Sequence, residues 1–189
     1  LSLGMEDILK QIRDFANTAH GTQTRKYSPD PYIVHPVRVM ESLKAYGATR
    51  PMLAAALLHD VLEDTPVSPV EMYTFLKTLL PVHEAEHVLK MVTELTDVFI
   101  HASYPQWNRR VRKEKELERV IQISPDAQTV KYADILDNST EIVAHDPDFA
   151  TRYLLESRAI LQNATKGHPE LRQRALEVVA QGLERMRSF

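Results

Sequence analysis

Apolar residues recur at intervals of three and four positions along almost the whole chain, and no segment alternates apolar with polar residues as a strand would. The first example is the apolar set Ile8, Leu9, Ile12, Phe15, Ala16 and Ala19, which would share one face of a helix. Spacing of this kind is typical of amphipathic helices, whereas half-buried strands show a period of two. The sequence therefore predicts an all-α protein.

Prolines indicate where individual helices begin. Five of them stand where a first helical turn would start, a position that tolerates the missing N–H group: Pro36, Pro51, Pro69, Pro125 and Pro147. The segment SPVE, residues 68–71, also has the spacing of a capping box. Ser124 and Asp146 are N-cap residues of the same kind. With Gly-His-Pro at 167–169 separating the last two helices, we expect a single-domain bundle of about eight or nine helices over residues 5–189.

Composition restricts the chemistry. The chain has 189 residues, enough for one core, and no cysteine, so any metal must be held by His, Asp or Glu. A formal net charge of −3 argues against a general nucleic-acid binder. No apolar run reaches the roughly 20 residues needed to cross a bilayer, so we expect a cytoplasmic protein with no membrane partner. Residues 1–4, before Met5, are expected to be a cloning remnant.

The segment AAALLHDVLEDTP, residues 54–66, places four ionisable side chains at the end of an apolar helix. These are His59, Asp60, Glu63 and Asp64, which helical spacing of three and four residues would crowd together. Repulsion among the carboxylates would raise their pKa values or break the helix unless a cation lies among them. A bound divalent metal would relieve this repulsion. A solvated helix end, without a metal, explains the same residues about equally well.

Further metal ligands would have to come from other helices. His35 lies among apolar residues just before Pro36, and Asp134 lies in the helical pattern TVKYADILDN. Each alone is unremarkable, because a buried His more often makes an ordinary hydrogen bond. Together with His59 and Asp60, however, they give the order His, His-Asp, Asp along a helical chain.

This order resembles the HD superfamily of metal-dependent phosphohydrolases. More narrowly, AHGTQTRKYSPDPYIVHP, LLHDVLEDT and VKYADILDN resemble the hydrolase domain of the RelA/SpoT family and its small stand-alone relatives, the Mesh-type alarmone hydrolases. The resemblance runs from about residue 19 to about residue 153. It implies an HD-type helical bundle and removal of the 3′-pyrophosphate from guanosine-3′,5′-bis(diphosphate), with hydrolysis alone expected.

The resemblance also implies roles for individual residues. The metal, Mn²⁺, would be held by His35, His59, Asp60 and Asp134, and mixed imidazole and oxygen donors suit such an ion. Glu63 and Asp64 match the pair that positions and deprotonates the attacking water. The expected substrate-binding residues are Arg25, Lys26, Asn138 and Tyr153. Independently of the resemblance, the charges of Arg109 and Lys113 suit phosphate binding, although an exposed helix face explains these two residues about equally well. For Arg25 and Lys26, a pair of exposed loop residues is the simpler interpretation. Lys131 also matches a lysine of the family pattern, and for it a structural role is the alternative.

Two departures from the family pattern leave the identity of the nucleotide substrate undecided. Gly21 comes one position early in the first motif, and residues 135–137 offer no basic side chain after Asp134. A nucleotide with fewer phosphates, such as NADPH losing its 2′-phosphate or another mononucleotide, is therefore an alternative substrate. A non-catalytic nucleotide sensor is the alternative from another class. The sequence leaves the oligomeric state open.

Overall fold

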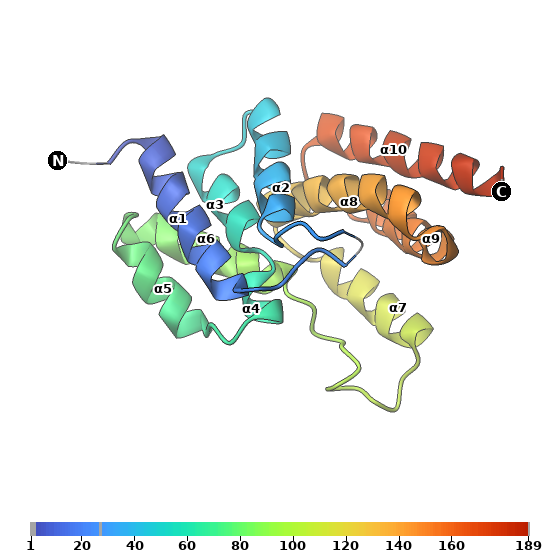
Figure 1. The fold of residues 1–189 in the computed structure, drawn as a ribbon, viewed down its shortest axis with the longest axis horizontal. Helices are drawn as coiled ribbons and strands as arrows, with labels where there is room; N and C mark the ends of the chain where they lie inside the picture. Colours follow the sequence, from blue (N-terminus) through green and yellow to red (C-terminus); the bar gives the residue numbers. More distant parts are fainter. Residues whose placement is uncertain (1–2, 27, 189) are drawn as a thin grey trace. The chain divides into compact units, whose positions relative to one another are not determined.

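The computed structural model describes residues 3–26 and 28–188, and regular structure in these ranges consists of ten helices and one isolated bridge between Thr24 and Pro31 (Figure 1). The predicted all-α class is confirmed. One of the ten, α4, is a single turn of four residues, so the longer helices agree with the expected number. Leu1 and Ser2 of the expected cloning remnant lie outside the described residues. None of the described helices combines the length and the apolar character needed to span a membrane.

Contacts divide the chain into two compact units, the first ending at Thr96 and the second beginning at Asp97. We describe each unit by itself. The expectation that residues 5–189 form a single domain stays a prediction.

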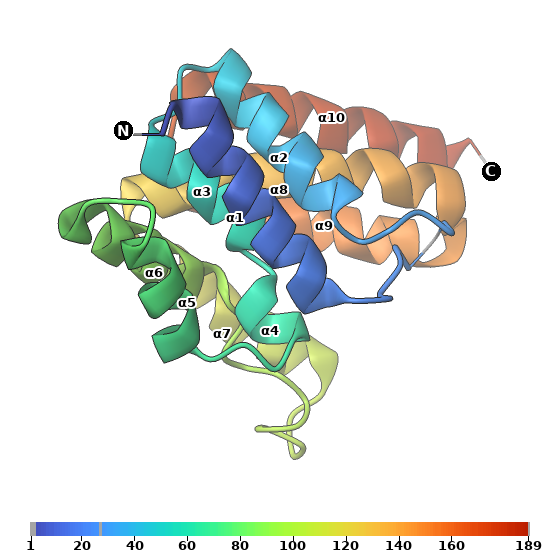
Figure 2. The ribbon, with the colours of Figure 1, turned by 60° about the vertical axis from the view of Figure 1, so that its left-hand side comes forward.

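The first unit is built around an apolar helix. Its helices are α1 (Met5–His20), α2 (Val34–Ala45), α3 (Arg50–Leu58), α4 (Val61–Asp64), α5 (Pro69–Lys77) and α6 (Val82–Leu95). Helix α3 packs against α1, α2 and α6, and every residue from Met52 to Leu58 is buried (Figures 1 and 2). A helix that is apolar on all sides belongs inside a core. This burial fixes the backbone that leads directly into His59.

The second unit is a helical bundle with α8 at its centre. It contains α7 (Arg109–Val120), α8 (Pro125–His145), α9 (Pro147–Asn163) and α10 (Pro169–Arg187). Helices α8, α9 and α10 pack against one another, and α7 packs against α9 (Figure 2). Twelve residues of α8 are buried, among them Asp134, an acid set into an otherwise mostly apolar surface.

The predicted helix starts are confirmed at their caps. The Ser68 hydroxyl accepts a hydrogen bond from the Glu71 N–H at 3.1 Å, and the Asp146 carboxylate accepts one from Phe149 at 3.2 Å. Ser124 occupies the N-cap position of α8. Each cap satisfies an N–H group that the helix itself leaves unbonded, which is why local sequence signals sufficed here.

The connection between α9 and α10 lies tightly against α8. The backbone N–H of Gly167 donates to the Tyr132 hydroxyl at 3.1 Å, and that of His168 donates to the Thr129 hydroxyl at 2.9 Å. A Cβ added at Gly167 would lie 2.5 Å from a ring carbon of Tyr132 and 2.9 Å from the backbone nitrogen of Thr129. The buried Tyr132 ring and the α8 backbone leave no room for that atom.

We therefore predict that Gly167→Ala lowers the free energy of unfolding by about 1–3 kcal/mol, through overpacking, in a urea titration. Gly4→Ala is the matched control, because its Cβ would meet only the Asp7 carboxylate at 4.0 Å; it should change stability by less than about 0.5 kcal/mol. Equal stabilities of the two variants would contradict this account of the connection.

Candidate metal centre and substrate site

The backbone changes direction at the end of α3. His59 still has helical angles, but Asp60 has φ −100° and ψ −3°, in the sparsely populated bridge region where active-site residues are often found. Glu63 and Asp64 then lie on the separate turn α4. The sequence analysis placed all four side chains at the end of one helix, and this is corrected: the helix breaks between His59 and Val61.

The protonation of His59 is set by the backbone. Its Nδ1 lies 2.6 Å from the carbonyl oxygen of Ala56, which accepts only if Nδ1 carries the proton. In the neutral ring Nε2 is then an acceptor, and it lies 3.1 Å from Oδ2 of Asp60. Two acceptor atoms this close require a proton or a cation between them. A His that donates one nitrogen to a carbonyl and presents the other is the usual arrangement of a metal ligand.

His35 completes a group of three donors within the first unit. It lies near the start of α2 with 1% of its surface exposed, and its ring centroid is 5.3 Å from that of His59. Its Nε2 atom is 3.8 Å from Oδ2 of Asp60. Two buried imidazoles and one carboxylate fit a divalent transition-metal cation. The predicted ligands His35, His59 and Asp60 therefore do lie together.

Asp60 is held from a second side by Tyr32. The Tyr32 hydroxyl donates to Oδ2 of Asp60 at 2.6 Å. Burial, with the Asp60 charge as a further cause, raises the pKa of Tyr32, so the phenol keeps its proton and stays a donor. Sequence reasoning missed this residue, although it lies three positions before His35 in the quoted motif.

Both expected catalytic acids, Glu63 and Asp64, are on the surface of α4. Partial loss of solvent and the nearby Asp60 charge raise the pKa of Asp64, while a hydrogen bond from Gln23 at 3.4 Å works in the opposite direction. Gln23 is in turn oriented by His20, whose Nδ1 lies 3.0 Å from the amide oxygen of Gln23. Sequence reasoning assigned no role in the site to Gln23 or His20.

The two predicted basic residues of the loop between α1 and α2, Arg25 and Lys26, lie in different environments. Arg25 is buried, and its guanidinium lies 5.1 Å from the centre of the Tyr32 ring. Its backbone N–H donates to the carbonyl of Asp30 at 2.9 Å, which closes the loop. Lys26 is exposed. The exposed-loop interpretation is therefore wrong for Arg25 and holds for Lys26.

Within the second unit, Asp134 has both carboxylate oxygens engaged by its own helix. Oδ1 accepts from the Asn138 amide at 3.1 Å, and Oδ2 accepts from the Lys131 ammonium at 3.1 Å. Burial opposes the charge of Lys131, but the neighbouring carboxylates of Asp134 and Asp97 outweigh it and raise the pKa of Lys131. Contacts within α8 thus hold the Asp134 carboxylate in a fixed orientation.

Tyr153 joins this group from α9. Burial and the Asp134 charge raise the pKa of Tyr153, although the Lys131 charge opposes them. Hydrogen bonds with Ser157 and Asn138 also work against the shift. The structure therefore brings Asn138 and Tyr153, two predicted substrate-binding residues, beside Asp134.

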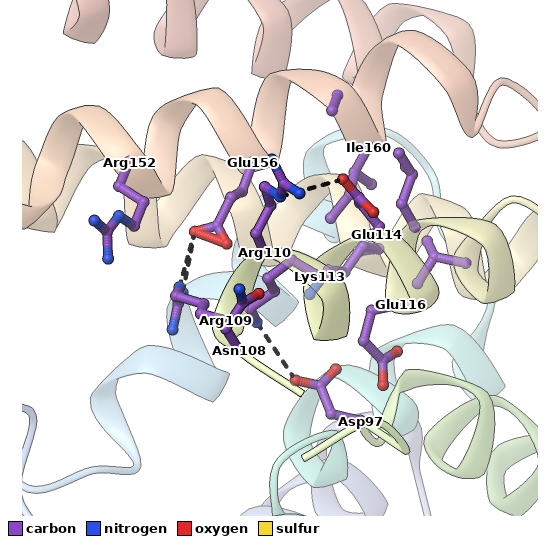
Figure 3. A pocket seen from close by; sticks show the side chains of 14 residues that line it. Asp97, Asn108, Arg109, Arg110, Lys113, Glu114, Glu116, Arg152, Glu156 and Ile160 are labelled. Carbon is purple, nitrogen blue, oxygen red and sulfur yellow. Dashed lines mark hydrogen bonds and ion pairs between the residues drawn. The ribbon is translucent and has the colours of Figure 1, made fainter. Parts of the chain in front are cut away.

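The remaining predicted residues, Arg109 and Lys113, line a cavity of about 590 Å³ between α7 and α9 (Figure 3). Lys131 lies at the same cavity, which connects it with the surroundings of Asp134. Arg109 already has a protein partner, because its guanidinium contacts Glu156 at 3.1 Å. Lys113 lies 4.0 Å from Asp97.

Comparisons with known proteins show the protein family and the fold. The HD domain family model matches residues 32–139, more than half of the chain. A solved structure described as a metazoan ortholog of SpoT that hydrolyses ppGpp superposes with a TM-score of 0.75 at 25% identity, covering 93% of this chain and 96% of that one. A Listeria monocytogenes structure, 20% identical with a TM-score of 0.60, shares the fold. The predicted HD-type bundle is confirmed.

Curated relatives narrow the family. MESH1 of Mus musculus and of Homo sapiens, both named guanosine-3′,5′-bis(diphosphate) 3′-pyrophosphohydrolase, are 33% identical over 138 and 144 residues. These matches cover 71% and 74% of this chain, and 69% and 72% of the relatives. A probable enzyme of the same name from Synechocystis sp. is 30% identical over 148 residues, but the chain spans only 18% of its length. The chain belongs to the HD domain family and, within it, to the family of the MESH1 proteins.

The contact between Tyr32 and Asp60 gives a test of the donor group. We predict that Tyr32→Phe weakens binding of Mn²⁺ by about 10–100-fold, because Asp60 loses the hydrogen bond that orients it. Isothermal titration calorimetry measures this directly. Tyr73→Phe is the matched control, since Tyr73 also donates to a carboxylate, Glu86 at 3.3 Å, on the surface. An unchanged affinity in Tyr32→Phe would show that Tyr32 does not orient a metal ligand.

Proposed function

We propose that this chain is a metal-dependent phosphohydrolase that removes the 3′-pyrophosphate of guanosine-3′,5′-bis(diphosphate). The observation that carries the proposal is the group of His35, His59 and Asp60. The Nε2 atoms of His59 and His35 lie 3.1 and 3.8 Å from Oδ2 of Asp60. The reaction is the one in the names of the mouse and human MESH1 relatives. We take residues 5–189 as one working domain, acting in the cytoplasm where such a nucleotide substrate is found.

We propose Mn²⁺ as the ion and Asp134 as the fourth ligand. The order His, His-Asp, Asp along the chain supports this choice, and hard oxygen donors mixed with imidazole suit Mn²⁺. When bound, the ion supplies a water of lowered pKa and a positive charge beside the phosphate. Lys131 and Asn138 would hold the Asp134 carboxylate in place, as their hydrogen bonds to its two oxygens suggest.

Glu63 and Asp64 would take the proton from the attacking water. A general base works best when its pKa lies near the working pH, and the pKa of Asp64 is raised toward that range. Gln23 would orient Asp64 through its amide group. Glu63, being exposed, can pass its proton to solvent after each turnover.

The nucleotide would lie against the basic and polar side chains described above. We assign Arg25 and Lys26 to the purine and phosphates, Asn138 and Tyr153 to the ribose, and Arg109 and Lys113 to phosphates. Support for Asn138 and Tyr153 comes from their hydrogen bond beside Asp134. The engagement of Arg109 by Glu156 favours the second candidate substrate, a nucleotide with fewer phosphates such as NADPH.

A product assay tests the proposal. Purified protein with Mn²⁺ should release pyrophosphate from guanosine-3′,5′-bis(diphosphate), and chelation by EDTA should abolish the release. Orthophosphate from NADPH, with no pyrophosphate from the guanosine compound, would favour the second candidate. Tight nucleotide binding without any turnover would instead identify a nucleotide sensor.

Two substitutions separate metal binding from proton transfer. Asp60→Ala should abolish Mn²⁺ binding in calorimetry, because it removes the only carboxylate among the three donors of the first unit. Glu63→Ala should keep the ion and lower kcat by about 10²–10⁴-fold, the usual contribution of a general base. Full activity of Glu63→Ala would remove Glu63 from the mechanism.

A further inference from the structure

The cavity between α7 and α9 is lined by both apolar and charged side chains (Figure 3). Leu117, Val120 and Ile160 contribute apolar surface, whereas arginine and lysine side chains contribute positive charge. Its volume of about 590 Å³ lies in the range of small-molecule sites. Because Lys131 touches both the cavity and Asp134, a nucleotide reacting beside Asp134 would extend its far end into this space.

Most cations at the cavity already face an acid. Lys113 lies 4.0 Å from Asp97, and Arg110 lies 3.9 Å from Glu114. These distances are at the limit of ion pairing, and the Arg110 and Glu114 side chains are 83% and 64% exposed, so solvent screens that pair strongly. Such loose pairs offer little resistance to an incoming anion.

The contact between Arg109 and Glu156 is different. Nε and Nη2 of Arg109 lie 3.3 and 3.1 Å from the same Glu156 oxygen, and both side chains are about two-thirds or more buried. The guanidinium also lies 4.8 Å from the centre of the Phe149 ring. Figure 3 shows the two side chains pointing toward each other at the cavity. A phosphate that recruits Arg109 must displace this partner.

Arg152 provides the contrast. It lies one turn before Glu156 on α9 and lines the same cavity, and it has no ion pair among the described residues. The cavity therefore presents Arg152, which is available at once, Lys113 and Arg110 in loose pairs, and Arg109 held by Glu156. A single phosphate needs few of these cations, whereas a diphosphate gains most when Arg109 is released as well.

We propose that Glu156 is a specificity-determining residue. By holding Arg109, it weakens the preference of the cavity for a nucleotide whose non-reacting end carries a diphosphate over one that carries a single phosphate. This inference rests on the proposed function for the orientation of the nucleotide. The preference itself is a property of binding and is measured without turnover.

The test compares guanosine 5′-monophosphate with guanosine 5′-diphosphate, titrated into the full chain saturated with Mn²⁺. The wild type should bind the diphosphate no more than about threefold tighter. In Glu156→Gln, which keeps a neutral hydrogen-bond acceptor for Arg109, the preference for the diphosphate should rise by about five- to tenfold, because a charge-assisted contact becomes available. The double variant Arg109→Gln/Glu156→Gln should lose this gain.

Glu118→Gln is the matched control. It also removes one acid from an ion pair, with Lys115 at 3.7 Å on α7, but it does not line the cavity. An equal gain in this control, a gain that persists without Arg109, or an unchanged ratio in Glu156→Gln would each overturn the proposal. So would the absence of binding of both nucleotides. Failure of the proposed function would instead appear as no turnover of guanosine-3′,5′-bis(diphosphate), with the binding ratios unaffected.

Discussion

The approach of two acceptor atoms, Nε2 of His59 and Oδ2 of Asp60, to 3.1 Å is the interaction on which the candidate site of the first unit depends. The His59 nitrogen cannot move away, because its ring is held by the Ala56 carbonyl and its backbone follows a fully buried helix. Asp60 cannot move away, because Tyr32 holds it. A cation that binds between these two atoms would stabilise the folded state. The fold and the metal site are therefore thermodynamically linked.

In the second unit, the Asp134 carboxylate is also held in place, but by neighbours on its own helix. Its two partners lie three residues before it and four residues after it on α8. One helix thus places a cation and an amide on the two oxygens of a single carboxylate, without help from other elements. A carboxylate oriented in this way is prepared for a ligand before the ligand arrives, which lowers the cost of binding.

Sequence alone predicted what local signals determine. Helix starts at Ser68 and Asp146 follow from caps that act within four residues, and the grouping of His35 with His59 and Asp60 follows from motif order. The break at Asp60 was missed, because nothing in HDVLED distinguishes a bent helix from a straight one. Tyr32 was missed because its partner lies 28 residues away. The pairing of Arg109 with Glu156 spans 47 residues, and only the packing of α7 on α9 creates it.

The pKa of Asp64 depends on the charge at Asp60. Burial and the negative charge of Asp60 raise the pKa of Asp64, whereas the Gln23 amide lowers it. A divalent cation bound by Asp60 would outweigh the single charge of that carboxylate and so reverse the second cause, which would make Asp64 a better-ionised carboxylate. For the base role that we propose for Asp64, the ability to accept a proton would then depend on the same cation that is proposed to activate the water.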